Sequence, residues 1–142
     1  MKNSLINEYA EIHYKKLYKI VIIKWLPSNE HMSEFEFHEL LHAIFGMATS
    51  FDTNIVYVDA CDFNYPVLKN TTKLVHNYLK ECPVINFKIV KSRHILGYNG
   101  ILRLIRDINS SRFRLKIFET RESGESWLNI LTTMKKNKEN TS

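Results

Sequence analysis

The fold of this 142-residue chain is decided by the stretch Asn54-Ile55-Val56-Tyr57-Val58-Asp59-Ala60-Cys61-Asp62-Phe63-Asn64-Tyr65-Pro66. Its first half is an unbroken apolar run rich in β-branched residues, which is typical of a central strand covered on both faces. Its second half is an acidic, aromatic loop. A long amphipathic segment precedes the stretch, so the local order is helix, buried strand and acidic loop. This order predicts a small α/β sheet domain.

Hydrophobic periodicity divides the rest of the chain into alternating strands and helices. Ser33 and Glu36 have the spacing of a capping box, and apolar residues recur at helical spacing from there to Phe51. A hairpin with a Lys15-Lys16 turn comes before this helix, and Pro83 ends the next one. Strands are expected at residues 11–14, 17–25, 54–59, 87–91 and 114–118. Helices are expected at residues 33–51, 70–82, 98–108 and 125–134.

This order of elements predicts an α/β fold built on a mainly parallel, five-stranded mixed sheet. The N-terminal hairpin adds an antiparallel edge, and right-handed crossovers place helices on the faces of the sheet. Residues 1–134 show no repeat and no linker, so we expect a single domain there. Residues 135–142 are polar and lysine-rich, and we expect them to form a disordered basic tail.

Composition narrows the class of protein. A hydrophobic fraction of 44% and a charged fraction of 25% are those of a soluble globular domain. No apolar run is long enough to cross a bilayer, and the N-terminus lacks the apolar core of a signal peptide, so we expect a cytoplasmic protein without a membrane partner. Cys61 and Cys82 are too few for a disulfide framework, and we expect two reduced thiols.

The net charge of +5 includes lysines of the tail, so the domain itself is only moderately basic. A second cluster of basic residues brackets the third helix and the last strand, where it could attract phosphates. It lacks the interleaved aromatics of a single-strand binder, so we expect a solvated charged face and no nucleic-acid partner. The cluster consists of Arg103, Arg106, Arg112, Arg114 and Lys116.

The segment from His38 to His42 matches the zinc-peptidase pattern His-Glu-x-x-His on a predicted helix. In that chemistry the two histidines bind zinc and Glu39 activates a water molecule. No histidine or glutamate follows at a familiar spacing to supply a third ligand, and Asp59 and Asp62 are the nearest candidates. Both histidines also flank the apolar stripe of the helix. We therefore expect partly exposed histidines, no metal and no cofactor, and keep a small zinc-dependent hydrolase as the alternative.

The acidic, aromatic loop is the candidate partner-binding site, because loops at the carboxyl ends of parallel strands often carry function and aromatics favour interfaces. The alternative is that Phe63 and Tyr65 pack beneath the second helix while Asp62 caps a turn. The candidate residues are Asp59, Asp62, Phe63, Asn64 and Tyr65.

From about Glu11 to Leu131 the chain resembles the STAS superfamily, the anti-sigma-factor-antagonist-like domains, and related CRAL-TRIO-like bacterial proteins. The resemblance implies a regulatory module that binds another protein and is not an enzyme. In the antagonists a partner kinase phosphorylates a serine after the central strand, but Asp59-Ala60-Cys61-Asp62 stands there in this chain, so that switch does not carry over. A homodimer is left open. The resemblance rests on Ile22-Ile23-Lys24-Trp25, on residues 56–63, and on Phe118-Glu119-Thr120-Arg121 with Trp127-Leu128.

Overall fold

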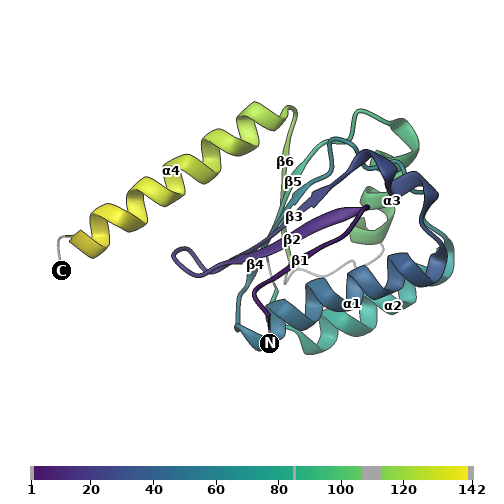
Figure 1. Cartoon of the computed structure of the whole chain (residues 1–142), viewed down its shortest axis with the longest axis horizontal. Coiled ribbons are helices and arrows are strands. Elements are labelled where there is room, and N and C mark those ends of the chain that lie inside the picture. The colour runs from purple at the N-terminus through teal and green to yellow at the C-terminus, as the bar shows by residue number, and fades with distance from the viewer. Residues whose placement is uncertain (1, 85, 107–112, 141–142) are drawn as a thin grey trace.

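The computed structural model describes residues 2–84, 86–106 and 113–140, and in them the chain forms one mixed sheet of six strands (Figure 1). The strands occur in the sheet in their order along the chain. Neighbours from β1 to β3 are antiparallel, and neighbours from β3 to β6 are parallel. The predicted α/β fold class is therefore confirmed. The strands are β1 (Ser4–Ile6), β2 (Ala10–Lys15), β3 (Ile20–Trp25), β4 (Ile55–Asp59), β5 (Asn86–Val90) and β6 (Arg114–Phe118).

The described helices follow the expected order, with one short 3-10 helix in addition. The predicted capping box begins α1: the Ser33 side chain accepts a hydrogen bond from the Glu36 amide, and the Glu36 side chain accepts one from the Ser33 amide. Proline at the start of η1 suits a first helical position, which needs no amide donor. The helices are η1 (Pro27–His31), α1 (Glu34–Ser50), α2 (Lys69–Glu81), α3 (Ile95–Arg106) and α4 (Arg121–Asn140).

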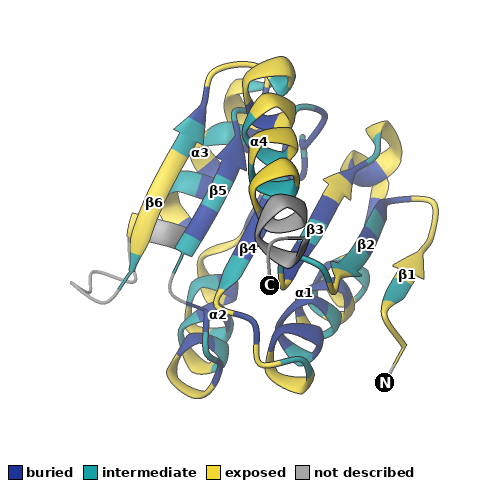
Figure 2. Cartoon of the chain, turned by 90° about the vertical axis from the view of Figure 1, so that its left-hand side faces the viewer, coloured by how far each residue is buried: buried dark blue, intermediate teal, exposed yellow. Residues whose placement is uncertain are grey.

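The helices cover the two faces of the sheet unequally. Because β3 to β6 lie in sequential order, right-handed crossovers place α1, α2 and α3 on the same face (Figure 1). Helix α4 follows the last strand and crosses the opposite face (Figure 2). We call these the three-helix face and the α4 face.

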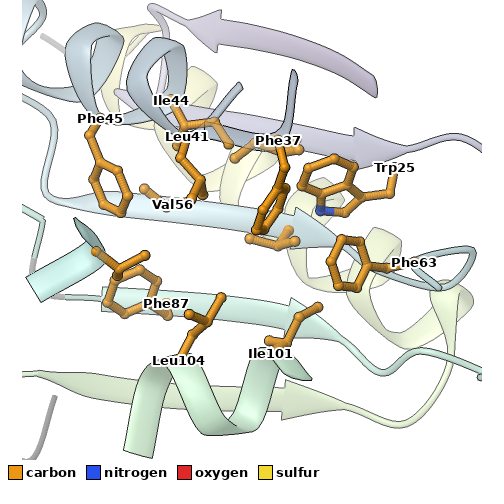
Figure 3. Close-up of a pocket in the computed structure, with 13 residues that line it drawn as sticks. Trp25, Phe37, Leu41, Ile44, Phe45, Val56, Phe63, Phe87, Ile101 and Leu104 are labelled. Carbon is orange, nitrogen blue, oxygen red and sulfur yellow. The ribbon is translucent and has the colours of Figure 1, made fainter. Parts of the chain in front are cut away.

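The core of the three-helix face is rich in aromatic side chains from separate elements (Figure 3). Trp25 on β3, Phe37 on α1 and Phe63 after β4 lie against one another, with ring centroids 4.8 Å apart for Trp25 and Phe63 and 6.1 Å apart for Phe37 and Phe63. These and neighbouring side chains surround an apolar cavity of about 90 Å³. This face therefore supplies most of the buried apolar surface of the described residues.

The core of the α4 face is smaller. Trp127 of α4 stacks on Tyr57 of β4 with the rings parallel and their centroids 6.1 Å apart. Gly124 permits this approach, because a Cβ at that position would lie 2.1 Å from the Tyr57 hydroxyl. Burial raises the pKa of Tyr57, as expected of a phenol held under a helix. The buried side chains of this core are Ile20, Tyr57, Val90 and Phe118.

Several elements differ from the prediction. The hairpin turn spans residues 16–19 and not Lys15-Lys16, so the strand predicted at 17–25 begins at Ile20; Lys19, at φ 52°, is in the left-handed turn conformation. The three-residue strand β1 was not predicted, because so short a segment has no readable alternation. Helix α3 begins at Ile95, three residues before the predicted start at Tyr98. The first turn was not predicted because its apolar residues Ile95 and Leu96 are exposed and do not belong to the buried apolar stripe of the helix. Helix α4 begins at Arg121 and continues through 135–140, which were predicted as disordered tail; lysine and glutamate are good helix formers and extend it. Ile108, Arg112 and residues 141–142 lie outside the described residues.

Within the described ranges, no helix combines the length and the apolar character that a membrane crossing requires.

Candidate binding site at the carboxyl edge of the sheet

The carboxyl ends of β5 and β6 border an open cavity of about 790 Å³, which we call the crevice. Its position follows from the topology. The chain leaves β5 for α3 on the three-helix face and leaves β6 for α4 on the opposite face. Adjacent strands whose connections depart to opposite faces open a gap at their carboxyl ends, where α/β proteins bind ligands. The crevice is lined by Cys61, Lys91, Ser92, Arg93, Ile95, Tyr98, Asn99, Glu119, Thr120, Arg121 and Glu122.

Two arginines of the crevice form ion pairs with two buried aspartates. Arg121 donates from Nε to Oδ2 of Asp59 over 2.7 Å and from Nη2 to Oδ2 of Asp62 over 3.3 Å. Arg93 donates from Nη2 to Oδ1 of Asp62. Both carboxylates are over nine-tenths buried and do not line the crevice. Buried carboxylates need charged hydrogen-bond partners, which the two arginines supply. The ion pairs in turn fix the positions of the two guanidinium groups.

The ion pairs shift the pKa values of Asp62, Arg93 and Arg121 toward the charged forms. Burial alone would raise the pKa of Asp62, but hydrogen bonds from Arg93 and Arg121 outweigh burial and hold the pKa below its usual value. The hydrogen bond to Asp59 is the main reason that the pKa of Arg121 is raised. The hydrogen bond to Asp62 raises the pKa of Arg93 in the same way.

Asn29, in η1, fixes the loop that follows β4. Its side-chain amide donates to the carbonyl oxygens of Leu26 and Asp62, each over 2.7 Å, and its Oδ1 accepts from the backbone amide of Asn64 over 2.8 Å. Asn29 is fully buried. Sequence reasoning missed this residue, because the segment after Trp25 was interpreted only as the end of a strand.

Ser92 fixes the same loop from the β5 side. Its Oγ donates to the Phe63 carbonyl over 2.7 Å, and the Arg93 amide donates to the Cys61 carbonyl over 3.1 Å. The floor of the crevice is therefore tied to two neighbouring loops. A site on so constrained a backbone is held in one geometry before anything binds.

The structure corrects the predicted aromatic patch. Phe63 and Tyr65 are 1% and 5% exposed and pack on the core beside Trp25 and Phe37, so a partner cannot contact them in this conformation. Both rings contact Phe37 of α1, and hydrogen bonds with Asn29 hold the backbone of the loop. Of the remaining predicted residues, Asp59 and Asp62 are buried in the ion pairs. Asn64 is half-buried and donates to Glu30 over 3.2 Å.

Other apolar side chains are exposed at the same edge. Helices that follow parallel strands begin at the carboxyl ends of those strands, and large apolar residues stand at the starts of α1, α2 and α3. Sequence reasoning missed them: Ile95 and Leu96 precede the predicted start of the third helix, and Phe35 and Leu68 were assigned no role. The four residues, which we call the apolar rim, are Phe35 (69% exposed), Leu68 (47%), Ile95 (77%) and Leu96 (69%).

The zinc-peptidase pattern contributes to packing between α1 and α2. Nε2 of His38 lies 3.1 Å from the Thr71 hydroxyl, and Nδ1 of His42 lies 3.0 Å from the Tyr78 hydroxyl. Glu39 is exposed. Among the described residues, no group of three histidine, cysteine, aspartate or glutamate side chains could hold a metal ion. Asp59 and Asp62, the suggested third ligands, are paired with arginines, so the available donors do not fit a catalytic zinc site.

The predicted basic cluster is spread over several elements. Arg103 donates to the Val67 carbonyl over 3.4 Å, and Arg106, Arg114 and Lys116 are exposed on α3 and β6. Arg112 lies outside the described residues.

No family model, curated protein or solved structure matches this chain. The resemblance to STAS-like modules therefore stays a prediction.

Proposed function

We propose that this protein is a non-enzymatic regulatory module that binds another protein through the carboxyl edge of its sheet. The exposure of the apolar rim carries this proposal. Single exposed apolar side chains are ordinary, but several at one edge of a domain are typical of an interaction surface. Ile95 and Leu96 are adjacent and belong to the first turn of α3, and Ile95 lines the crevice.

The surroundings of Ile95 and Leu96 support docking at this edge. Protein interfaces combine an apolar centre with a polar margin, and arginine and tyrosine are enriched in them. Arg93 and Tyr98 flank the apolar pair and line the crevice. The loop beneath is held by buried hydrogen bonds of Asn29 and Ser92, so little conformational entropy is lost on binding.

The STAS-like resemblance supports the same class of function, and we keep it as part of the proposal. The loop at Asp59-Ala60-Cys61-Asp62 lacks the phosphoacceptor serine of the antagonists, so the proposed module works without that switch. Cytoplasmic action also belongs to the proposal. Among the described residues, Cys61 and Cys82 form no disulfide, which is compatible with a reducing compartment.

Paired surface variants test the docking site. The wild-type protein and two double variants are used as bait in extract of the source organism, and bound proteins are quantified by mass spectrometry. Ile95→Ser with Leu96→Ser alters the edge. Ile130→Ser with Met134→Ser is the matched control, because it removes two equally exposed apolar side chains from α4.

We expect the edge variant to lose its specific partner by about tenfold or more, as hot-spot residues do, while the control retains it. Equal retention by both variants, with the fold checked by circular dichroism, contradicts docking at the edge. Loss of the partner in the control variant alone would show that the interface lies on α4 and would contradict docking at the edge.

A further inference from the structure

The crevice has features that the proposed protein-docking function does not use. It is an open cavity of about 790 Å³ with a largely charged and polar lining, whereas the apolar rim consists of exposed apolar side chains. Three cationic side chains line it: Lys91, Arg93 and Arg121. Two carboxylates, Glu119 and Glu122, line it as well, and Asp59 and Asp62 pair with the two arginines. Four carboxylates thus accompany three cations, so an anion would be recognised by hydrogen-bond donors that the ion pairs leave available, and not by an excess of positive charge.

The arginines are oriented for an anion in the crevice. Asp59 and Asp62 contact Arg121 through its Nε and Nη2 atoms, and Asp62 contacts Arg93 through Nη2. Both guanidinium groups keep further N–H donors, since each carries five. The Arg93 side chain is 63% exposed and lines the crevice, so its remaining donors are accessible to a ligand there. Arginine held in this way is well suited to planar or tetrahedral oxyanions.

Lys91 completes the positive side of the cavity. Its ammonium group lies 3.5 Å from Glu119 and 5.1 Å from the centre of the Tyr98 ring. The pair with Glu119 joins two solvent-exposed side chains and is weak, so an incoming anion can compete for the lysine. Ile95 and Tyr98 form an apolar wall beside these charges.

We propose that the crevice is a binding site for a small organic anion. Its oxyanion group, phosphate or carboxylate, is held by Arg93 and Arg121, and its carbon portion lies against Ile95 and Tyr98. The site is at the border between the two faces of the sheet, where α/β folds bind their ligands. The anion site shares Arg93, Ile95 and Tyr98 with the proposed docking edge, but it is tested with small probes and without any protein partner.

Three probes test the site by isothermal titration calorimetry at constant ionic strength. Inorganic phosphate measures the oxyanion contact alone. Phenyl phosphate adds a ring that can contact Tyr98, and benzoate keeps the ring but replaces the phosphate by a carboxylate. We expect saturable binding, with phenyl phosphate about tenfold tighter than inorganic phosphate, because the ring buries additional apolar surface. Comparison of phenyl phosphate with benzoate identifies the preferred oxyanion.

Matched arginine variants locate the binding. Arg93→Gln should weaken the binding of phenyl phosphate by about tenfold, the usual cost of a lost charge-assisted hydrogen bond. Arg103→Gln is the control, since Arg103 lies on α3 outside the lining of the crevice. Lys91→Gln, in the lining of the same cavity, is a second variant that can be used if Arg93→Gln does not fold. We expect it to weaken the binding of phenyl phosphate by about threefold.

Cys61 provides an independent readout, because its thiol lines the crevice whereas Cys82 is buried in the core. Saturating phenyl phosphate should slow alkylation of Cys61 by iodoacetamide and leave Cys82 unchanged, as measured by peptide mass spectrometry. Absence of saturable binding for all three probes overturns the proposal. Equal affinities of Arg93→Gln and Arg103→Gln for phenyl phosphate also overturn it.

Discussion

The two faces of the sheet are built very differently. The three-helix face buries a continuous aromatic core, whereas the α4 face relies on one helix and a few side chains. The difference arises from the sequential strand order, which sends three crossovers to one face and leaves the last helix for the other. The crevice opens where the covering helices change face, between β5 and β6. The topology that concentrates stability on one face therefore also places the candidate site at its border.

The largest expected effect is on the three-helix face. Phe63→Ala should lower the free energy of unfolding by about 3–5 kcal/mol, because it removes a fully buried ring. Urea denaturation followed by tryptophan fluorescence measures this loss. A loss below about 1 kcal/mol, the range of surface substitutions, contradicts the burial of Phe63.

The corresponding variant on the α4 face should cost less. Trp127→Ala removes the ring stacked on Tyr57, but Trp127 is only partly buried, so we expect a loss of about 2 kcal/mol. The same denaturation experiment gives the value. A loss of unfolding free energy equal to that of Phe63→Ala would show that the two faces contribute equally to stability.

Asp62→Asn tests the ion pairs at the border. The pKa of Asp62 is lowered in the folded protein, so its stabilising effect is present above its ordinary pKa and is lost as pH falls through the folded value. At neutral pH we expect the variant to be about 1–2 kcal/mol less stable than wild type, and this difference should shrink below about pH 4. Thermal unfolding at a series of pH values measures the difference. A difference that stays constant through the acid range means that the carboxylate is not specifically stabilised.

The smallest effects belong to the two histidines of the zinc-peptidase pattern. His38→Ala and His42→Ala should each cost about 0.5–1 kcal/mol, since each loses one hydrogen bond between α1 and α2. Added zinc should not change the melting temperature of either variant or of wild type. One zinc per chain that raises the wild-type melting temperature and is lost in the double variant would restore the hydrolase alternative.

Periodicity predicted the α/β class and nearly all strands and helices, because each buried face leaves a local pattern. Helix α1 is the best case, since its capping residues Ser33 and Glu36 are only three positions apart. The crevice could not be predicted in this way. Arg121 and Asp59 are 62 residues apart, and no local signal pairs them.

The aromatic loop shows a second limit of the sequence. Phe63 and Tyr65 after a strand fit both an interface and a core. In the structure both rings are buried, and the loop backbone is held by the fully buried Asn29, which is more than thirty positions away in the sequence. The opposite error concerns Ile95 and Leu96: the sequence did not predict that they lie on the surface, and the structure shows that both are exposed.

The central claim is that recognition takes place at the carboxyl edge of the sheet. Hydrogen–deuterium exchange of the captured complex, compared with the free protein, tests it most directly. We predict slower exchange in residues 91–99 and 119–124 and in the apolar rim, with no change in the exposed part of α4 around Ile130. Protection confined to α4, or to the amino ends of the parallel strands, contradicts the claim.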